Sequence, residues 1–348
     1  MKRFVQAVCA AVAIWSFNTV YAAENGINYD PAHDQPWFDA QQSNDTSMMY
    51  TLLLQDLAQI KAMGFGTIKT YYSLYCSING NCTPSIAGAA KNQGLKLLVG
   101  VYEFRMPEDN CEPWCLSGTE QQVKAAIAHA REHPDVVIGI VVGNEDMFDW
   151  QGNPRPDMQK RIVQDIKTIQ DQVSVPVTTA QRQGDWCGGP QPGCDPKRTN
   201  SLNLSDPYGV LNTVQIIGAN IFPYWGGSPE NVGGQSVASK TQTTAGHLKQ
   251  ALGKNVIVTE EGWPSCASNT QNPTSISDEI DYFQTWSKHE NQTVDSYYFM
   301  AYDINIGCQE GFKDADKHFG LCATNGVTKD PRLIACPARI TLPVRAGQ

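Results

Sequence analysis

Short apolar segments rich in β-branched residues alternate with amphipathic segments along almost the whole chain of 348 residues. Residues 136–142 form a continuous apolar run, typical of a strand in a sheet that is covered on both faces. Eight strand-and-helix units predict an α/β fold, a single closed (β/α)8 TIM barrel, whereas six or seven would predict an open doubly wound sheet. The expected strands lie near residues 26–29, 67–71, 96–102, 136–142, 175–179, 214–221, 255–259 and 296–301.

The first 22 residues differ from this pattern. Lys2 and Arg3 precede an apolar run, 4–15, that is too short to span a bilayer, and small residues follow at 22–23. This arrangement predicts a secretory signal peptide over 1–22, with a buried apolar helix as the alternative. We expect the catalytic barrel to occupy 23–335 and a C-terminal tail to occupy 336–348. The expected location is therefore extracellular, and association with a cell wall is compatible with it.

The net charge of −9 restricts the partners of the chain. Charged residues make up only 18% of it, and they form no basic stripe of the kind that binds nucleic acid or an anionic membrane surface. A neutral ligand suits this surface better. We expect a polysaccharide partner, no nucleic acid, no membrane after removal of the signal peptide, no cofactor and no bound metal, and a monomeric protein.

The cysteine content also indicates export. Of 11 cysteines one lies in the expected signal peptide, so 11 − 1 = 10 remain, an even number that predicts disulfides in an oxidising compartment. A zinc site is the alternative, but no second pair stands at finger spacing. The cysteines form three sequence-close pairs, Cys76/Cys82, Cys111/Cys115 and Cys187/Cys194, with Cys266, Cys308, Cys322 and Cys336 remaining; acceptor triplets for N-glycosylation lie at Asn44, Asn81, Asn203 and Asn291.

Two carboxylates stand where the chemistry of such a barrel is expected, at the C-terminal ends of strands. Glu145 follows the apolar run at 136–142, and Glu260 follows the strand near 255–259. Two facing carboxyl groups can cleave a glycosidic bond, one as a proton donor and one as a nucleophile. The simpler interpretation is that each acid caps the helix that follows it.

Tryptophans are concentrated in the segments after the expected strands. Indole planes suit the flat C–H faces of sugar rings, so these side chains predict a polysaccharide cleft; anchoring of the loops to the barrel is the alternative for each. The residues are Trp37, Trp114, Trp150, Trp186, Trp225 and Trp263, whereas Trp286 lies in an expected helix.

Motifs at five of the expected strands resemble those of glycoside hydrolase family 17. The most specific is Glu-x-Gly-Trp-Pro-Ser at 260–265. The resemblance extends from about residue 25 to residue 330 and implies a barrel-fold retaining enzyme acting chiefly on β-1,3-glucans, in a family that includes endoglucanases, exo-acting enzymes and glucanosyltransferases. The other motifs are Gly26-Ile27-Asn28-Tyr29, Gly143-Asn144-Glu145, Ala219-Asn220-Ile221-Phe222-Pro223-Tyr224 and Tyr298-Phe299-Met300-Ala301-Tyr302-Asp303, with Phe319-Gly320-Leu321 resembling the terminal block.

The resemblance also implies roles for individual residues. Glu145 would be the acid/base and Glu260 the nucleophile of a double displacement, with their carboxyl groups roughly 5–5.5 Å apart. Asn144 would donate a hydrogen bond to the 2-hydroxyl group of the substrate. We expect the substrate to be bound by Tyr29, Tyr71, Asn144, Asn220, Tyr224, Trp225 and Trp263.

The chain departs from the family pattern at three places. Glu261 stands where Ser or Thr is usual, and strand alternation predicts that it points away from Glu260. Lys69 stands where relatives often carry Arg. After the last strand, 303–307 lacks the Glu that relatives tend to carry there, which leaves the balance of hydrolysis and transfer open.

Two other motifs suggest metal binding. His129-Ala130-Arg131-Glu132-His133 fits a zinc-protease pattern, but it ends a helix on the far side of the barrel, where solvated histidines are the simpler interpretation. Asp314-Ala315-Asp316 faintly resembles a calcium loop. The functional alternatives are a secreted β-1,3-glucan hydrolase, a glucanosyltransferase that remodels wall glucan, and a catalytically silent glucan-binding protein; a mixed-linkage glucan or cellulose hydrolase is weaker.

Overall fold

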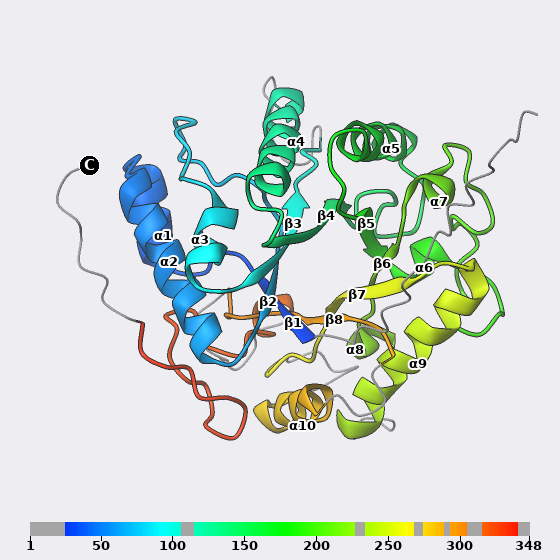
Figure 1. Cartoon of the computed structure of the whole chain (residues 1–348). Helices are drawn as coiled ribbons and strands as arrows, with labels where there is room; N and C mark the ends of the chain where they lie inside the picture. Colours follow the sequence, from blue (N-terminus) through cyan, green and yellow to red (C-terminus); the bar gives the residue numbers. More distant parts are fainter. Residues whose placement is uncertain are drawn as a thin grey trace, which may run out of the picture.

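Eight parallel strands form a closed barrel in the computed structural model, which describes residues 25–105, 115–226, 234–267, 274–288, 293–304 and 315–339 (Figure 1). Each strand pairs with its neighbours in chain order, and β1 also pairs with β8 to close the ring. The closed barrel is therefore confirmed, and the open sheet is wrong. The strands are β1 (Asn25–Tyr29), β2 (Thr67–Thr70), β3 (Lys96–Val101), β4 (Val137–Asn144), β5 (Val177–Arg182), β6 (Ile217–Asn220), β7 (Val256–Glu261) and β8 (Ser296–Tyr298).

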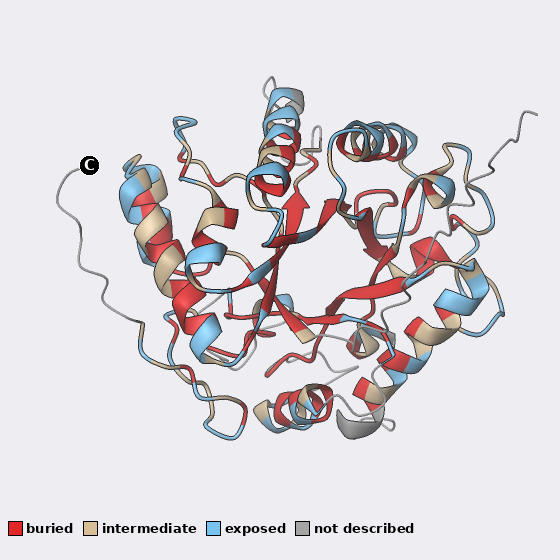
Figure 2. Cartoon of the chain, viewed as in Figure 1, coloured by how far each residue is buried: buried red, intermediate tan, exposed pale blue. Residues whose placement is uncertain are grey.

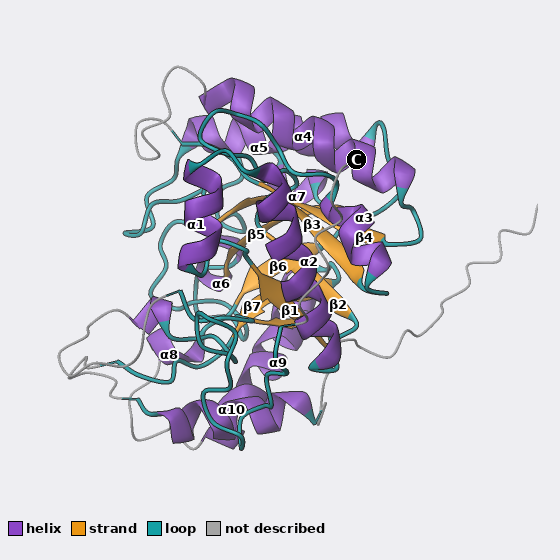
Figure 3. Ribbon diagram, turned by 90° about the vertical axis from the view of Figure 1, so that its left-hand side faces the viewer, coloured by secondary structure: helices purple, strands orange, loops and turns teal. Residues whose placement is uncertain are grey.

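Helices surround the barrel and cover its outer face (Figures 1 and 3). In the helix Pro156–Gln170, the buried residues Ile162, Ile166 and Ile169 recur at helical spacing, so one stripe packs inward and the rest faces solvent. The helices are α1 (Gln35–Gln42), α2 (Thr46–Ala62), α3 (Ile86–Asn92), α4 (Cys115–Glu132), α5 (Pro156–Gln170), α6 (Gln183–Trp186), α7 (Val210–Thr213), α8 (Pro223–Gly226), α9 (Gly234–Leu252) and α10 (Ile276–Ser287), with a 3-10 turn at Ala315–Lys317.

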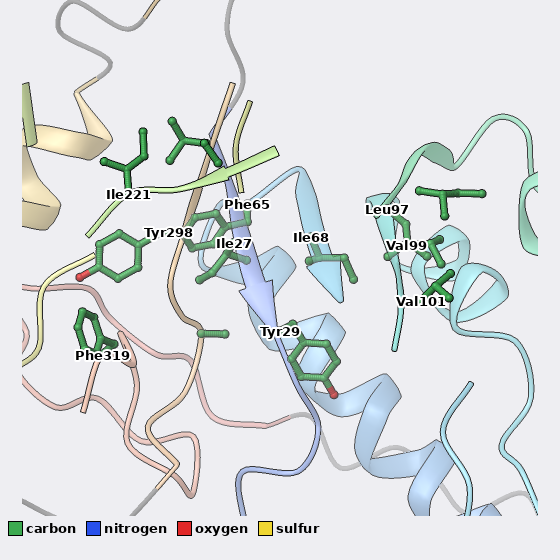
Figure 4. Close-up of a cluster of buried hydrophobic side chains, with 14 of the residues drawn as sticks. Ile27, Tyr29, Phe65, Ile68, Leu97, Val99, Val101, Ile221, Tyr298 and Phe319 are labelled. Carbon is green, nitrogen blue, oxygen red and sulfur yellow. The ribbon is translucent and has the colours of Figure 1, made fainter. Parts of the chain in front are cut away.

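Almost all residues of the strands are buried (Figure 2). Their outward side chains pack against the helices in one large cluster, which includes Ile27, Ile68 and Leu97 (Figure 4). A smaller cluster, which includes Leu98 and Val141, fills the interior of the ring. Successive strand residues point to opposite faces, except where the register shifts, as it does near the C-terminal ends of β4 and β7.

Three disulfides join described residues, Cys76 to Cys82, Cys187 to Cys194 and Cys322 to Cys336. The first two join cysteines that are close in the sequence and the third joins two of the remaining four, a connectivity that the sequence alone left open. Cys9, Cys111 and Cys308 lie outside the described residues, as do the expected signal peptide and Asn291.

The first residues of the expected tail are attached to the barrel. Cys336 is held by its disulfide, and the guanidinium group of Arg339 forms ion pairs with Asp34 and, at 2.8 Å, with the buried Asp56 of α2. Residues 336–339 therefore pack with the barrel, beyond the boundary expected at 335. Among the described residues, no helix is both long and apolar enough to cross a membrane.

Candidate active site

The chain leaves β4 through a turn that places Glu145 at the rim of the barrel. Gly143 and Glu145 both have left-handed backbone, with φ of 72° and 56°, which glycine adopts freely and glutamate rarely does. A Cβ atom at Gly143 would also lie only 2.9 Å from Ile162 Cδ1. The N–H of Glu145 donates to the carbonyl of Ala180 on β5 at 2.8 Å, which fixes the turn.

The carboxyl group of Glu145 is held from β6. Asn220 Nδ2 donates to Glu145 Oε1 at 2.9 Å and lies 3.3 Å from Asn144 Oδ1, while Asn220 Oδ1 accepts the Thr259 hydroxyl at 2.7 Å. Burial and, after it, the negative charge of Glu260 together raise the pKa of Glu145 to about 7, and the Asn220 hydrogen bond opposes the shift. Glu145 can therefore carry a proton near neutral pH, as a general acid must.

Glu260 at the end of β7 has a different environment. Lys69 Nζ and the Tyr71 hydroxyl both donate to Glu260 Oε1 at 2.9 Å. The pKa of Lys69 is lowered by burial, an effect that Glu260 opposes, and the pKa of Tyr71 is raised well above 10, first by burial and then by the Glu260 charge. Two donors, an ammonium group and a neutral hydroxyl group, thus share one carboxyl oxygen. Such hydrogen bonds stabilise a carboxylate anion.

Asn28 on β1 fixes the position of Lys69. Its Oδ1 accepts from Lys69 Nζ at 3.0 Å, and its Nδ2 donates to the carbonyls of Thr259, Tyr297 and Tyr298 at 3.1 to 3.3 Å. The ammonium also lies 4.3 Å from the centre of the Tyr71 ring. The cation beside Glu260 is thus held by β1, β2 and the strand that carries Glu260.

The neighbouring Glu261 points out of the ring, on the side opposite Glu260, as expected for adjacent strand residues. The register of β7 shifts after Val258, so Glu261 faces outward although Ile257 belongs to the interior cluster. Its carboxyl group accepts hydrogen bonds from the hydroxyl of Tyr282 on α10, at 2.7 Å, and from the hydroxyl of Ser296. Burial raises the pKa of Glu261 to about 7, against these hydrogen bonds. Glu261 therefore belongs to the layer between barrel and helices and not to the mouth.

The structure brings Tyr71, Asn144, Asn220, Glu145 and Glu260 together. The expected sugar-binding aromatic residues are more dispersed. Tyr29 is fully buried and donates to Asp56 of α2 at 3.0 Å, so its ring belongs to the core (Figure 4).

Tyr224 and Trp263 are buried and lie against each other edge to face, with ring centres 5.3 Å apart. By contrast, Trp225 is 51% exposed and Trp150 is 82% exposed. Trp37 and Trp186 are buried, and Trp114 lies outside the described residues. Anchoring of the segments after the strands therefore accounts for four buried aromatic residues, Trp37 after β1, Trp186 after β5, Tyr224 after β6 and Trp263 after β7.

Sequence reasoning missed the role of Asn28 and noted Lys69 only as a departure from Arg. The available signal was the spacing of Lys69 and Tyr71, which places both on one face of β2. Asp303 accepts from the N–H of Gly320 at 2.8 Å and pairs with Lys329 at 3.1 Å, so it anchors the segment after β8.

The motif at residues 129–133 that resembles a zinc-protease pattern takes part in hydrogen bonds within the fold. His129 is buried, and its two ring nitrogens lie 2.8 Å from the Ser73 carbonyl and 3.0 Å from the Ser85 hydroxyl, so the expectation of solvated histidines is wrong for this residue. Within the described ranges, no group of three or more His, Cys, Asp or Glu residues is placed to hold a metal ion. Asp314 of the calcium-like loop lies outside those ranges.

A (β/α)8 barrel with two carboxyl groups in unlike environments at its mouth has the equipment of a glycoside hydrolase. The chain matches the family described as the BtgE/BtgC glycoside hydrolase domain over residues 26–320, and it belongs to that family. This confirms the expectation of a glycoside hydrolase, while the assignment to family 17 stays a prediction. No curated protein matches the chain in sequence.

Solved structures with a similar fold include several glycosidases. An endo-laminarinase from Formosa Hel1_33_131 is 17% identical, with a TM-score of 0.63 over 88% of this chain and 84% of that one. An active-site mutant of Rhizomucor miehei β-1,3-glucanosyltransferase in complex with laminaritriose is 19% identical, with a TM-score of 0.56 over 91% and 97% of the two chains. A GH5_18 structure from Streptomyces cattleya in complex with GlcNAc is 13% identical, with a TM-score of 0.59 over 90% and 77%. At these identities the likeness shows the fold.

Proposed function

We propose that this protein is an exported retaining glycoside hydrolase that cleaves β-1,3-glucan. The observation that carries the proposal is the contrast between its two carboxyl groups at the barrel mouth. Glu145 has a pKa of about 7 and an amide partner, whereas Glu260 has an ammonium and a phenol. A retaining mechanism needs one protonated and one ionised carboxyl group.

In the first step, Glu260 attacks the anomeric carbon while Glu145 protonates the glycosidic oxygen. The bond between that carbon and oxygen breaks, the leaving sugar departs with the proton, and a glycosyl ester of Glu260 remains. Lys69 and Tyr71 both contact Oε1 of Glu260, so we assign the attack to Oε2.

In the second step, Glu145 acts as a base. It removes a proton from a water molecule, whose oxygen attacks the same anomeric carbon and releases Glu260 as a carboxylate. Two inversions retain the configuration of the anomeric carbon. The pKa of about 7 suits a group that donates a proton in one step and accepts one in the next.

The substrate class rests on the motifs that resemble family 17 and on two neighbours in fold that are named a laminarinase and a β-1,3-glucanosyltransferase. The disulfides and the acidic, low-charge composition fit an extracellular protein that acts on a neutral polymer.

Transfer of the glycosyl group to a second glucan chain is the alternative activity. It requires only that a sugar hydroxyl replace water in the second step, and an exposed Trp225 at the rim could support an acceptor sugar. A catalytically silent glucan-binding protein is disfavoured, because both carboxyl groups and their partners are in place.

The test is an assay of the purified protein on β-1,3-, mixed β-1,3/1,4- and β-1,4-glucans, with the products sized and their anomeric configuration followed by NMR. We expect release of β-configured oligosaccharides from the β-1,3 polymer. Products longer than the substrate at high oligosaccharide concentration would assign the transferase. Inversion of configuration, or binding of glucan without any cleavage, would refute the proposed function.

A further inference from the structure

The segment that follows β4, residues 145–149, carries the expected proton donor and has an unusual backbone. Glu145 has a φ of 56°, in the left-handed region that residues other than glycine rarely adopt. A residue persists in such a conformation only where the surrounding structure holds it there. The contacts around this segment therefore decide where the carboxyl group of Glu145 lies.

The end of β5 holds the first part of the segment through its N–H groups. The carbonyl of Ala180 accepts the N–H of Glu145 at 2.8 Å. Gln181 Oε1 accepts the N–H of Met147 at 3.2 Å, while Gln181 Nε2 donates to the hydroxyl of Thr179 at 2.8 Å, so the amide group is itself held in place. Neither contact reaches the rest of the segment.

Arg182, the last residue of β5, holds the second part through its carbonyl groups. Its Nη2 donates to the carbonyls of Phe148 and Asp149 at 3.2 and 2.7 Å. In the ladder between β5 and β6, Arg182 pairs with Asn220, whose amide donates to the carboxyl group of Glu145. One arginine thus joins the segment that carries the acid to the strand position beside the amide that holds that acid.

A buried carboxylate fixes the side chain of Arg182. Asp185 Oδ2 accepts from Arg182 Nε at 2.8 Å, and the Asp185 side chain is fully buried. Asp185 also pairs with Arg198, which lies in the chain beyond the Cys187–Cys194 disulfide. Because a guanidinium group and a carboxylate pair in a defined planar geometry, Asp185 sets the direction in which Arg182 donates to the two carbonyls.

The nucleophile is held from the other side of the ring. Lys69 and Tyr71 of β2 donate to Glu260, and Asn28 of β1 accepts from Lys69. These strands lie across the closed barrel from β5. A change at Arg182 should therefore displace the acid and leave the nucleophile in place.

We propose that Arg182 is a positioning residue for the acid/base: its hydrogen bonds to two backbone carbonyls of the segment after β4 keep Glu145 aimed at the glycosidic oxygen. The inference rests on the proposed function and adds a residue that acts through the backbone of another segment. It predicts a loss confined to substrates whose leaving group needs a proton.

The first test compares a laminari-oligosaccharide, whose leaving sugar needs a proton, with a dinitrophenyl β-glycoside of the same sugar, whose leaving group departs without one. For Arg182→Met we expect kcat/KM to fall about 10²-fold on the oligosaccharide and less than about fivefold on the dinitrophenyl glycoside. The assays run about one unit below the Glu145 pKa of about 7, so that the acid is protonated. Equal losses on both substrates, or no loss on the oligosaccharide, overturn the proposal.

Arg131→Met is the matched control for this comparison. Arg131 also donates to a backbone carbonyl, that of Gln172 at 3.1 Å, but it lies in the last turn of α4, which leads into the opposite end of β4. The variant should keep wild-type kcat/KM on both substrates. Arg182→Lys keeps a cation for Asp185 without the planar fork of donors; it should show the same selective loss, about tenfold, and provides the test if Arg182→Met does not fold.

A double variant separates the carbonyl contacts from the ion pair. Arg182→Met leaves the buried Asp185 with one cation fewer, and Arg182→Met with Asp185→Asn removes that charge as well. We expect the double variant to stay as impaired on the oligosaccharide as Arg182→Met. Recovery to near wild-type kcat/KM would show that only the ion pair matters and would overturn the proposal.

Hydrogen exchange tests the inference without turnover. The N–H groups of Glu145 and Met147 are bonded to β5, and they should exchange at least about tenfold faster in Arg182→Met than in wild type or Arg131→Met. Unchanged exchange overturns the positioning role. A wild-type protein that cleaves neither substrate overturns the proposed function, and the exchange rates then still decide whether Arg182 holds the segment.

Discussion

Two adjacent residues at the end of β7 show how the two faces of a strand can give the same side chain opposite surroundings. Glu260 faces the barrel mouth and meets a lysine and a tyrosine, whereas Glu261 faces the helices and meets two hydroxyl groups. Both are buried. The two residues therefore differ in the charge of their partners and not in their burial. A cation compensates the charge of a buried carboxylate, which hydroxyl groups alone do not.

The comparison explains why one of two identical residues suits nucleophilic attack. A buried carboxyl group without a cation is easier to protonate, and a protonated carboxyl group is a poor nucleophile. The same reasoning separates Glu260 from Glu145, whose direct partner is the neutral amide of Asn220.

The strongest test exchanges each member of the adjacent pair in turn. Glu260→Gln should lower kcat on β-1,3-glucan by about 10⁴-fold or more, because no other carboxylate occupies its place. Glu261→Gln is the matched control and should keep kcat within about threefold. Near wild-type turnover in Glu260→Gln, measured as reducing sugar released, would refute the assignment.

Removal of the cation should make the environment of Glu260 more like that of Glu261. Lys69→Met should lower kcat by about 10²-fold, since loss of one preorganised donor in an active site typically costs that much. The loss should be largest at acidic pH, because without the ammonium group the carboxylate takes up a proton more readily.

Lys69→Arg should restore part of the activity and of the acidic pH range, a recovery that a merely structural role does not predict. Lys91→Met, which removes an exposed ion pair with Asp135, is the matched control and should leave the pH profile unchanged. A uniform loss at all pH values would contradict a charge-based role for Lys69.

Glu145 should set the alkaline limb of the pH profile. Its pKa of about 7 means that kcat/KM should fall about tenfold per pH unit above pH 7, as the donated proton is lost. The Asn220 hydrogen bond lowers the pKa of Glu145, so Asn220→Ala should move this limb to higher pH. Asn153→Ala, in an exposed loop, is the control, and a limb that does not move in Asn220→Ala would refute the link.

The smallest expected effect concerns stability. Burial raises the pKa of Glu261 from an ordinary value of 4.5 to about 7, so the stabilising contribution of its protonated form is complete below pH 4.5 and is lost as the pH rises through 7. The shift of 2.5 units corresponds to about 3 kcal/mol. The free energy of unfolding of Glu261→Gln should therefore rise relative to wild type by up to this amount between pH 4 and pH 8. Denaturant titrations at both pH values measure it, with the exposed Glu132→Gln as a control that should show no such change.

The barrel could be predicted because its signal is repeated eight times. A run such as 136–142 identifies a strand buried on both faces. Alternation predicts that Glu260 and Glu261 point to opposite sides, but the register shift in β7, which the sequence does not reveal, turns Glu260 and not Glu261 toward the mouth. The boundaries were less predictable: β6 is shorter than expected, because the chain at 214–216 precedes the ladder.

The site was predicted in part for a physical reason. Glu145 and Glu260 directly follow apolar runs, so their neighbours in the sequence are enough to place them at strand ends. The role of Lys69 depends on Asn28 and Glu260, which are 41 and 191 positions away in the chain. Tyr29 was expected to bind substrate because it belongs to a family motif at a strand end, but its side chain points to α2, where Asp56 accepts a hydrogen bond from its hydroxyl group. A sequence motif identifies where a strand lies. It does not show whether the last side chain of that strand points into the barrel or toward the helices.

The attachment of the C-terminal segment bears on how the molecule is made. Arg339 pairs with Asp56, which precedes it by 339 − 56 = 283 positions, and the loop that carries Arg339 is tied down by the bond between Cys322 and Cys336. Synthesis proceeds from the N-terminus, so Asp56 has left the ribosome long before its partner exists. The packing around Asp56 is therefore completed only once Arg339 has been made, and a nascent chain stalled before Arg339 leaves Asp56 with its Tyr29 and His33 contacts but without its guanidinium partner.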